Sequence, residues 1–281
     1  MNTWTGSSAR LPGSELLFRH FCLIVAGAFL CPAQPGVAQT SGTGLTPPIK
    51  GDFFILGAGF GPEYIGAEDT IWAVAPAGQF TFDRGQFLLQ ANYLTLDLIT
   101  KDSWSLGPAG LLRFGRSDVE NAQVDALPDI DLTVELGLHG GYTWNPEDLR
   151  RRGGVGGSIL FDVGGVHDGY LVSANIRQWL PVGRFSALGI AVGATYGSDD
   201  YTDTFFGIDA DGAADSGLPI FPARGGGRDV RVAAVYVQPV SDRWAVGAGF
   251  LYARLLGDAA DSPVALARDQ VYFGIGGARA W

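Results

Sequence analysis

The sequence predicts an all-β protein, a transmembrane antiparallel up-and-down β-barrel of about twelve strands, with ten strands as the alternative. Three observations support this fold class. Apolar and polar residues alternate with a period of two in segments of roughly ten residues, the length at which a tilted strand crosses a bilayer. After residue 38, no apolar run reaches the roughly 20 residues that a spanning helix needs. Glycine occupies 42 of the 281 positions, which suits strands that bend around a crowded interior.

The N-terminus has the features of a secretory signal peptide. Arg10 and Arg19 precede a short apolar run at residues 21–30, and small residues lead to Ala38. A charged stretch, a short apolar core and a small-residue cleavage site define such a signal, and ten apolar residues are too few to span a membrane. We therefore expect residues 1–38 to direct export and to be removed.

The rest of the chain divides into a lead and a barrel. Residues 39–50 are polar, contain a proline pair, and are expected to form a flexible N-terminal lead. Residues 51–281 are expected to form the barrel. Both cysteines, Cys22 and Cys31, precede the expected cleavage site, so the mature protein has no thiolate nucleophile, disulfide framework or cysteine metal site.

The charge of the mature protein argues against one class of partner. The full chain has 19 basic and 29 acidic side chains. Removing Arg10, Arg19 and Glu15 leaves 17 basic and 28 acidic side chains, a net charge of 17 − 28 = −11. Nucleic-acid binding requires a basic face, and we expect no nucleic-acid partner.

Residues 132–144 show the alternation most clearly. One face of this segment is apolar and ends in aromatic residues, while the other is polar or small. Alternation alone fits either a soluble β-sandwich or a membrane barrel. Aromatic residues at strand ends, the strand length, and polar faces rich in glycine and alanine but poor in lysine and glutamate favour the barrel.

Eleven strands can be assigned from this pattern. Bacterial single-chain barrels have an even number, so one strand is missed or merged, and residues 201–208 are a candidate for it. The connections at 198–228 and 256–268 are long, which is typical of extracellular loops. The connections on the other side of the barrel, such as 181–184 and 238–242, are short, which is typical of periplasmic turns. The assigned strands are 53–62, 71–82, 86–97, 105–115, 131–144, 155–163, 169–180, 185–197, 230–239, 243–255 and 269–281.

Four stretches of the C-terminal third, together and in this order, resemble the MipA/OmpV family of outer-membrane proteins. They are YTDTFFGI from Tyr201, SGLPIFPARGG from Ser216, DRWAV from Asp242 and LLGDAADSPVA from Leu255. The resemblance extends over nearly all of residues 51–281. It implies a barrel in the Gram-negative outer membrane. One member is described as a scaffold that joins a lytic transglycosylase to a peptidoglycan synthase, and other members are linked to adhesion and antibiotic susceptibility.

The sequence contains little that indicates catalysis or metal binding. Neither His139 nor His167 accompanies a nucleophile-elbow motif, so we predict no catalytic residues, no cofactor and no enzyme. The acidic stretch 209–215 resembles part of a calcium loop but lacks the closing bidentate glutamate. We therefore expect a solvated acidic loop and predict no metal site.

Charged residues on the inward-facing parity form a candidate polar network in the lumen. Such a network either rigidifies a nearly closed barrel or lines a polar path. We expect a non-enzymatic barrel that contacts outer-membrane lipid and the assembly machinery, and that organises peptidoglycan-remodelling enzymes; a narrow solute channel or a surface adhesin is the alternative. The candidate lumen residues are Arg113, Glu135, His139, Asp162, Arg177 and Arg231.

Overall fold

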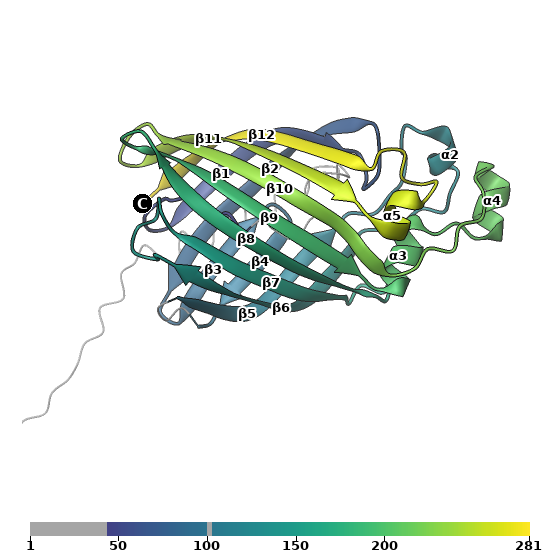
Figure 1. The fold of residues 1–281 in the computed structure, drawn as a ribbon, viewed down its shortest axis with the longest axis horizontal. Helices are drawn as coiled ribbons and strands as arrows, with labels where there is room; N and C mark the ends of the chain where they lie inside the picture. Colours follow the sequence, from purple (N-terminus) through teal and green to yellow (C-terminus); the bar gives the residue numbers. More distant parts are fainter. Residues whose placement is uncertain (1–43, 100–102) are drawn as a thin grey trace, which may run out of the picture. The chain divides into compact units, whose positions relative to one another are not determined.

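The structure is a computed structural model that describes residues 44–99 and 103–281. It is a closed antiparallel barrel of twelve strands, each paired with its sequence neighbours, and β1 closes the ring against β12 (Figure 1). The predicted fold class is confirmed. The proposed signal peptide, residues 1–38, lies outside the described residues. The strands are β1 (Phe53–Pro62), β2 (Thr70–Phe82), β3 (Gly85–Gln90), β4 (Tyr93–Asp97), β5 (Trp104–Arg113), β6 (Thr133–Trp144), β7 (Gly153–Asp162), β8 (Tyr170–Val182), β9 (Ser186–Gly197), β10 (Gly226–Pro239), β11 (Trp244–Leu255) and β12 (Asp269–Ala280).

The strand absent from the sequence assignment lies within the predicted segment 86–97. This segment is two short strands, β3 and β4, joined by a tight turn at Ala91 and Asn92. Ala91 adopts the left-handed conformation with φ of 55°. An alanine there carries no turn signal, because glycine, asparagine and aspartate are the residues that normally mark positive φ.

All four helices of the described chain belong to connections at one end of the barrel, opposite the C-terminus (Figure 1). We refer to this as the loop end and to the opposite end, with its short connections, as the turn end. Long loops face the exterior and short turns the periplasm in barrels of this kind. The helices are α2 (Ala122–Asp125), α3 (Asp199–Phe206), α4 (Ala210–Ser216) and α5 (Gly257–Asp261).

The interpretation of residues 201–208 as a separate strand is wrong, because they lie largely within helix α3. The side chain of Ser198 accepts a hydrogen bond from the backbone N–H of Tyr201, which caps the N-terminus of the helix. Tyr201, Thr202, Phe205 and Phe206 are buried together. Their i, i+1, i+4, i+5 spacing marks one face of a helix. This signal is easily missed, because the segments around it alternate as strands do.

The outward face of the barrel is apolar across its middle and carries aromatic residues toward both ends. Near the loop end, Phe60 packs against Trp72 with ring centroids 5.6 Å apart. Near the turn end, Trp104 packs against Tyr142 at 5.0 Å. Between these levels the exposed side chains are aliphatic, as with Ile176, which is 52% exposed. An apolar band between two aromatic girdles is the surface that a lipid bilayer requires. Among the described residues, no helix is long and apolar enough to cross a membrane.

Residues 44–50, the described part of the expected N-terminal lead, enter the barrel at the turn end. Leu45 is only 4% exposed and packs with Trp179, Ala187 and Ala233, whose side chains point into the lumen. Residues 39–43 lie outside the described part. The lead therefore contributes to filling the interior of the barrel.

Candidate functional site

The loop end of the barrel is closed by its own connections. Helix α3 contributes Tyr201 and Phe206, each fully buried, to an apolar cluster that also contains Leu255 of β11 and Ala259 of α5. The hydroxyl of Ser262 donates a 2.6 Å hydrogen bond to the carbonyl oxygen of Phe206 and thereby fixes the loop after β11 to the helix. These contacts form a cap over the lumen, built from connections that are far apart in the sequence.

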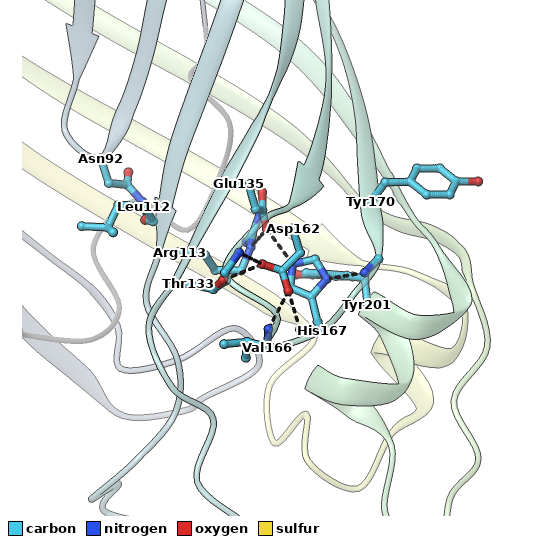
Figure 2. A network of polar contacts seen from close by, with 12 residues as sticks. Asn92, Leu112, Arg113, Thr133, Glu135, Asp162, Val166, His167, Tyr170 and Tyr201 are labelled. Carbon is cyan, nitrogen blue, oxygen red and sulfur yellow. Dashed lines mark hydrogen bonds and ion pairs between the residues drawn. The ribbon is translucent and has the colours of Figure 1, made fainter.

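A buried ion pair lies directly beneath this cap. The guanidinium of Arg113 at the end of β5 donates two hydrogen bonds to the carboxylate of Glu135 on β6, one from Nε to Oε1 and one from Nη2 to Oε2 at 2.9 Å (Figure 2). His167 completes the group, with Nε2 located 3.0 Å from Glu135 Oε1. All three side chains are essentially inaccessible to solvent. Bidentate geometry offsets part of the large desolvation cost of a buried charge pair.

Asp162 orders the β7–β8 loop that delivers His167 to this pair. Its carboxylate accepts backbone hydrogen bonds from Val166, His167 and Asp168 at 2.6–3.0 Å. It also accepts a 2.5 Å hydrogen bond from the hydroxyl of Thr133. The loop is therefore wound around one carboxylate, and the position of the imidazole follows from that winding.

A second group of charges lies on β10, further along the barrel wall than β5 and β6. Asp229 on β10 pairs with Arg228 at 2.6 Å and with Arg231 at 3.0 Å, and all three are buried. Arg231 also donates a 2.5 Å hydrogen bond to the hydroxyl of Thr195 on β9. A β-bulge between Gly227 and Asp229 shifts the strand so that adjacent residues both point inward, an outcome that strict alternation does not predict.

Tyr201 of the cap lies between the two groups. The guanidinium carbon of Arg113 is 5.1 Å from the centre of its ring, and that of Arg228 is 5.7 Å away. The His167 ring meets it edge-on at 5.2 Å. In Figure 2 Tyr201 points into the network, whereas Tyr170 of β8 points away from it. The ring of Tyr201 thus contacts a buried guanidinium group from each set, and the face of an aromatic ring attracts cations.

The outermost loops contain buried ionisable groups of their own. Burial raises the pKa of Glu63, whose carboxylate accepts a hydrogen bond from the backbone N–H of Glu120. Burial also raises the pKa of Tyr64 to about 12, and its hydroxyl donates to the carbonyl oxygen of Val264 at 3.2 Å. Burial lowers the pKa of Arg116, which donates to the carbonyl oxygen of Phe205. These bonds attach the loop after β1 and the loop after β5 to each other and to the cap.

Residues 44–49 divide the part of the lumen near the turn end, which we call the lower lumen, into two cavities. Leu45, Pro47 and Ile49 line an apolar cavity of about 390 Å³ against β1–β3 and β10–β12. Gly44 and Thr46 line a polar cavity of about 270 Å³ against β2–β8. We call these the apolar and the polar cavity. Apolar and polar or small residues alternate along the segment, so its two sides match the apolar and the polar half of the barrel interior.

Four acidic or basic side chains line the polar cavity: Asp97, His139, Arg152 and Arg177. Arg152, in the turn after β6, donates hydrogen bonds to the carbonyl oxygens of Thr46 at 2.6 Å and Pro47 at 3.2 Å. Burial and the nearby charge of Arg177 lower the pKa of Arg152 to about 10. His139 Nε2 lies 3.3 Å from Asp97 Oδ1, yet both atoms are buried without a hydrogen-bond partner in the described chain.

The six predicted lumen residues thus fall into three groups. Arg113, Glu135 and Asp162 lie under the cap, and Arg231 pairs with Asp229 on β10. The other two, His139 and Arg177, line the polar cavity at the turn end. All six occur on strand positions whose alternation predicts an inward direction. The alternation does not predict the partners that come from loops, from the bulge or from a short strand: Asp97, Arg152, His167, Tyr201, Arg228 and Asp229.

The acidic stretch at residues 209–215 has a different structure from a calcium loop. It begins helix α4, whose N-cap is Asp209, and the carboxylate of Asp209 accepts a 2.8 Å hydrogen bond from the backbone N–H of Gly212. Within the described residues, no group of three or more histidine, cysteine or acidic side chains has an arrangement suited to a metal ion.

The sequence matches one protein-family model over residues 55–281, described as MltA-interacting protein MipA. The chain belongs to the MipA family. A search of curated proteins found no relative that matches this MipA-family chain significantly.

Several solved structures resemble this MipA-family barrel in fold. The NanC porin has a TM-score of 0.48 at 8% identity, over 82% of this chain and 100% of its own. The translocator domain of the autotransporter NalP from Neisseria meningitidis has a TM-score of 0.43 at 10% identity, over 95% and 96%. An outer-membrane channel from Pseudomonas putida F1 has a TM-score of 0.43 at 12% identity, over 89% and 100%.

The two ends of this MipA-family barrel differ in charge. The six loop-end connections contain three arginines and seventeen acidic residues, a net charge of 3 − 17 = −14. The turn end, counted as residues 44–52 and the five turns, contains eight basic and six acidic residues, a net charge of 8 − 6 = +2. Large apolar side chains are also exposed there, such as Phe185 at 60% and Val240 at 60%. The end that barrels of this kind direct toward the periplasm is therefore the end with cationic and apolar surface.

Proposed function

We propose that this protein is a non-enzymatic barrel of the outer membrane, exported by its signal peptide, that holds peptidoglycan-remodelling enzymes at its periplasmic turn end. The family description supports a partner of this kind, since it names an interaction with MltA. The expected partners are a lytic transglycosylase and, through it, a peptidoglycan synthase.

The observation that carries the proposal is the closure of the barrel. The cap at the loop end and residues 44–49 at the turn end both fill the interior. A barrel whose interior is filled by its own loops offers no wide path for solutes. Its outer surfaces are therefore the better candidates for function. Of those surfaces, the turn end combines arginine side chains with exposed apolar ones, the composition that favours protein–protein contact.

Site-specific photo-crosslinking in intact cells tests this proposal. A crosslinker at Arg151 or Val240, both exposed at the turn end, should capture a lytic transglycosylase. The same crosslinker at Asp211 or Asp215 of the loop end serves as the matched control and should not. Capture of no cell-wall enzyme from either turn position, with normal capture of the assembly machinery, contradicts the scaffold.

The alternatives predict different results. A narrow solute channel predicts ohmic conductance steps in planar bilayers from the intact chain, altered by substitution of Glu135 or Arg177. An adhesin predicts that exchange of the acidic loops abolishes binding to surfaces while turn-end crosslinks persist. The scaffold predicts neither effect.

A further inference from the structure

We infer that the polar cavity at the turn end binds a small hydroxylated organic anion, of the class of acidic sugars, between Arg152 and Arg177. This site is separate from the turn-end surface proposed to hold enzymes, and the inference goes beyond that function.

The charge of the cavity favours an anion. Arg152 and Arg177 both line it, whereas Asp97 is the sole carboxylate among its lining residues. In the described chain, no carboxylate lies within salt-bridge distance of either arginine; they donate hydrogen bonds to carbonyl oxygens of the lead and to the side chain of Asn175. The two guanidinium groups therefore retain donors, and an anion between them would relieve their mutual repulsion.

Asp97 Oδ1 and His139 Nε2 lie within ion-pair distance, 3.3 Å apart, but without hydrogen-bond geometry, which leaves both atoms available to a ligand hydroxyl. Asp97 Oδ1 and His139 Nε2 are buried, line the cavity and lack a hydrogen bond within the described residues. A buried polar atom without a partner costs about 1–3 kcal/mol, so native structures rarely leave two of them side by side. A hydroxyl group is both donor and acceptor, and one placed beside these two atoms would bond to both.

The remaining lining suits a sugar. Amide and hydroxyl side chains line the wall from β2 around to β8, and the aromatic rings of Tyr93 and Trp179 add apolar faces. The volume of about 270 Å³ is below the roughly 300–1,000 Å³ of pockets for drug-sized ligands, which fits a monosaccharide. The amide and hydroxyl side chains include those of Gln79, Gln86, Gln90, Ser105, Ser158 and Asn175.

Calorimetric titration of the folded protein in detergent at low ionic strength tests the inference. The probes are glucuronate, glucose 6-phosphate and glucose. We expect saturable binding of one anion per barrel and at least tenfold weaker binding of glucose. Tighter binding of glucuronate would identify a sugar carboxylate as the ligand type, and tighter binding of glucose 6-phosphate a sugar phosphate. Equal affinity for glucose and the anions, or no binding of either anion, overturns the inference.

Variants separate a binding role from a structural one. Arg177→Gln should weaken anion binding about 10- to 100-fold, the loss of a hydrogen bond to a charged group. Asp97→Asn removes the competing negative charge and should strengthen it, an effect in the opposite direction that misfolding does not produce. Arg243→Gln, at an exposed arginine of the same end, is the control and should bind as the wild type does. An equal loss in Arg243→Gln and Arg177→Gln, or weaker binding by Asp97→Asn, contradicts the site.

Discussion

Arg228 of the barrel wall donates a 3.0 Å hydrogen bond to the hydroxyl of Tyr201 in the cap, and both side chains are buried. The bond joins β10 to helix α3, so the closure of the loop end and the charged lumen form a single structure. Tyr201→Phe keeps the packing of the ring but leaves an Arg228 N–H without its acceptor. We expect this change to destabilise the cap by about 1–3 kcal/mol.

Limited proteolysis of the loop at 198–225 measures that effect. The Tyr201→Phe protein should be cut faster within this loop than the wild type, while the barrel strands stay resistant. Tyr196→Phe alters an exposed, outward-facing tyrosine and should leave the rate unchanged. Equal rates for Tyr201→Phe and wild type would show that the bond does not hold the cap.

Glu135→Gln should destabilise the protein by about 3–5 kcal/mol, because it leaves the buried Arg113 without its counter-charge. The free energy of unfolding in urea, followed by tryptophan fluorescence, measures this loss. Asp168→Asn, at an exposed position whose φ of 51° asparagine tolerates, is the control. A loss below about 1 kcal/mol in Glu135→Gln, the range of an exposed ion pair, would contradict the buried pair.

The raised pKa of Tyr64 predicts a loss of stability in alkali. Folding raises the pKa of this phenol from its ordinary value of 10.0 to about 12, so the folded protein keeps a proton that the unfolded chain releases. The contribution is fully present below pH 10 and is lost as the pH rises toward 12, amounting to roughly 2–3 kcal/mol. Tyr64→Phe should have a flatter stability profile between pH 10 and 12, measured by urea unfolding at each pH. Parallel profiles would contradict the prediction.

Ile176→Arg should weaken folding into lipid vesicles by about 2–4 kcal/mol, the cost of an arginine near the centre of the lipid-facing surface of a barrel. Ile176 is at the middle of β8 and faces outward. Ile220→Arg places the same charge on a loop-end residue that is 62% exposed, and it should cost less than about 0.5 kcal/mol. Equal costs for the two variants would show that the outward stripes do not contact lipid.

Deletion of residues 44–49 should open the lower lumen. The segment separates the polar and apolar cavities, and its removal joins them into one space. The intact, capped barrel should give no ohmic steps in planar bilayers, whereas the deletion should give small steps whose size the cap limits. Deletion of helix α4, at the far tip of the loop end (Figure 1), is the control and should leave conductance unchanged. Unaltered conductance after deletion of 44–49 would contradict the role of the segment.

The alternation of the sequence determined the fold class and the inward direction of most charged residues. A strand has a period of two, so parity alone places Glu135 and Arg177 in the lumen and Ile176 toward lipid. The even strand number of closed barrels also showed that one strand was missing from the assignment. The direction of a side chain follows from local alternation, and the strand count follows from a rule for closed sheets. Both can therefore be inferred from a single sequence.

Only the tertiary structure decided which inward-facing residues meet. His167 reaches Glu135 through a loop wound around Asp162, and Asp229 turns inward because of a bulge. The turn at Ala91 also depends on a neighbour distant in sequence, because its N–H donates to the carbonyl oxygen of Pro76. Leu45 enters the lumen because glycine and alanine on the facing strands leave space for it. Each of these outcomes is set by packing between segments far apart along the chain, and neither periodicity nor composition records such packing.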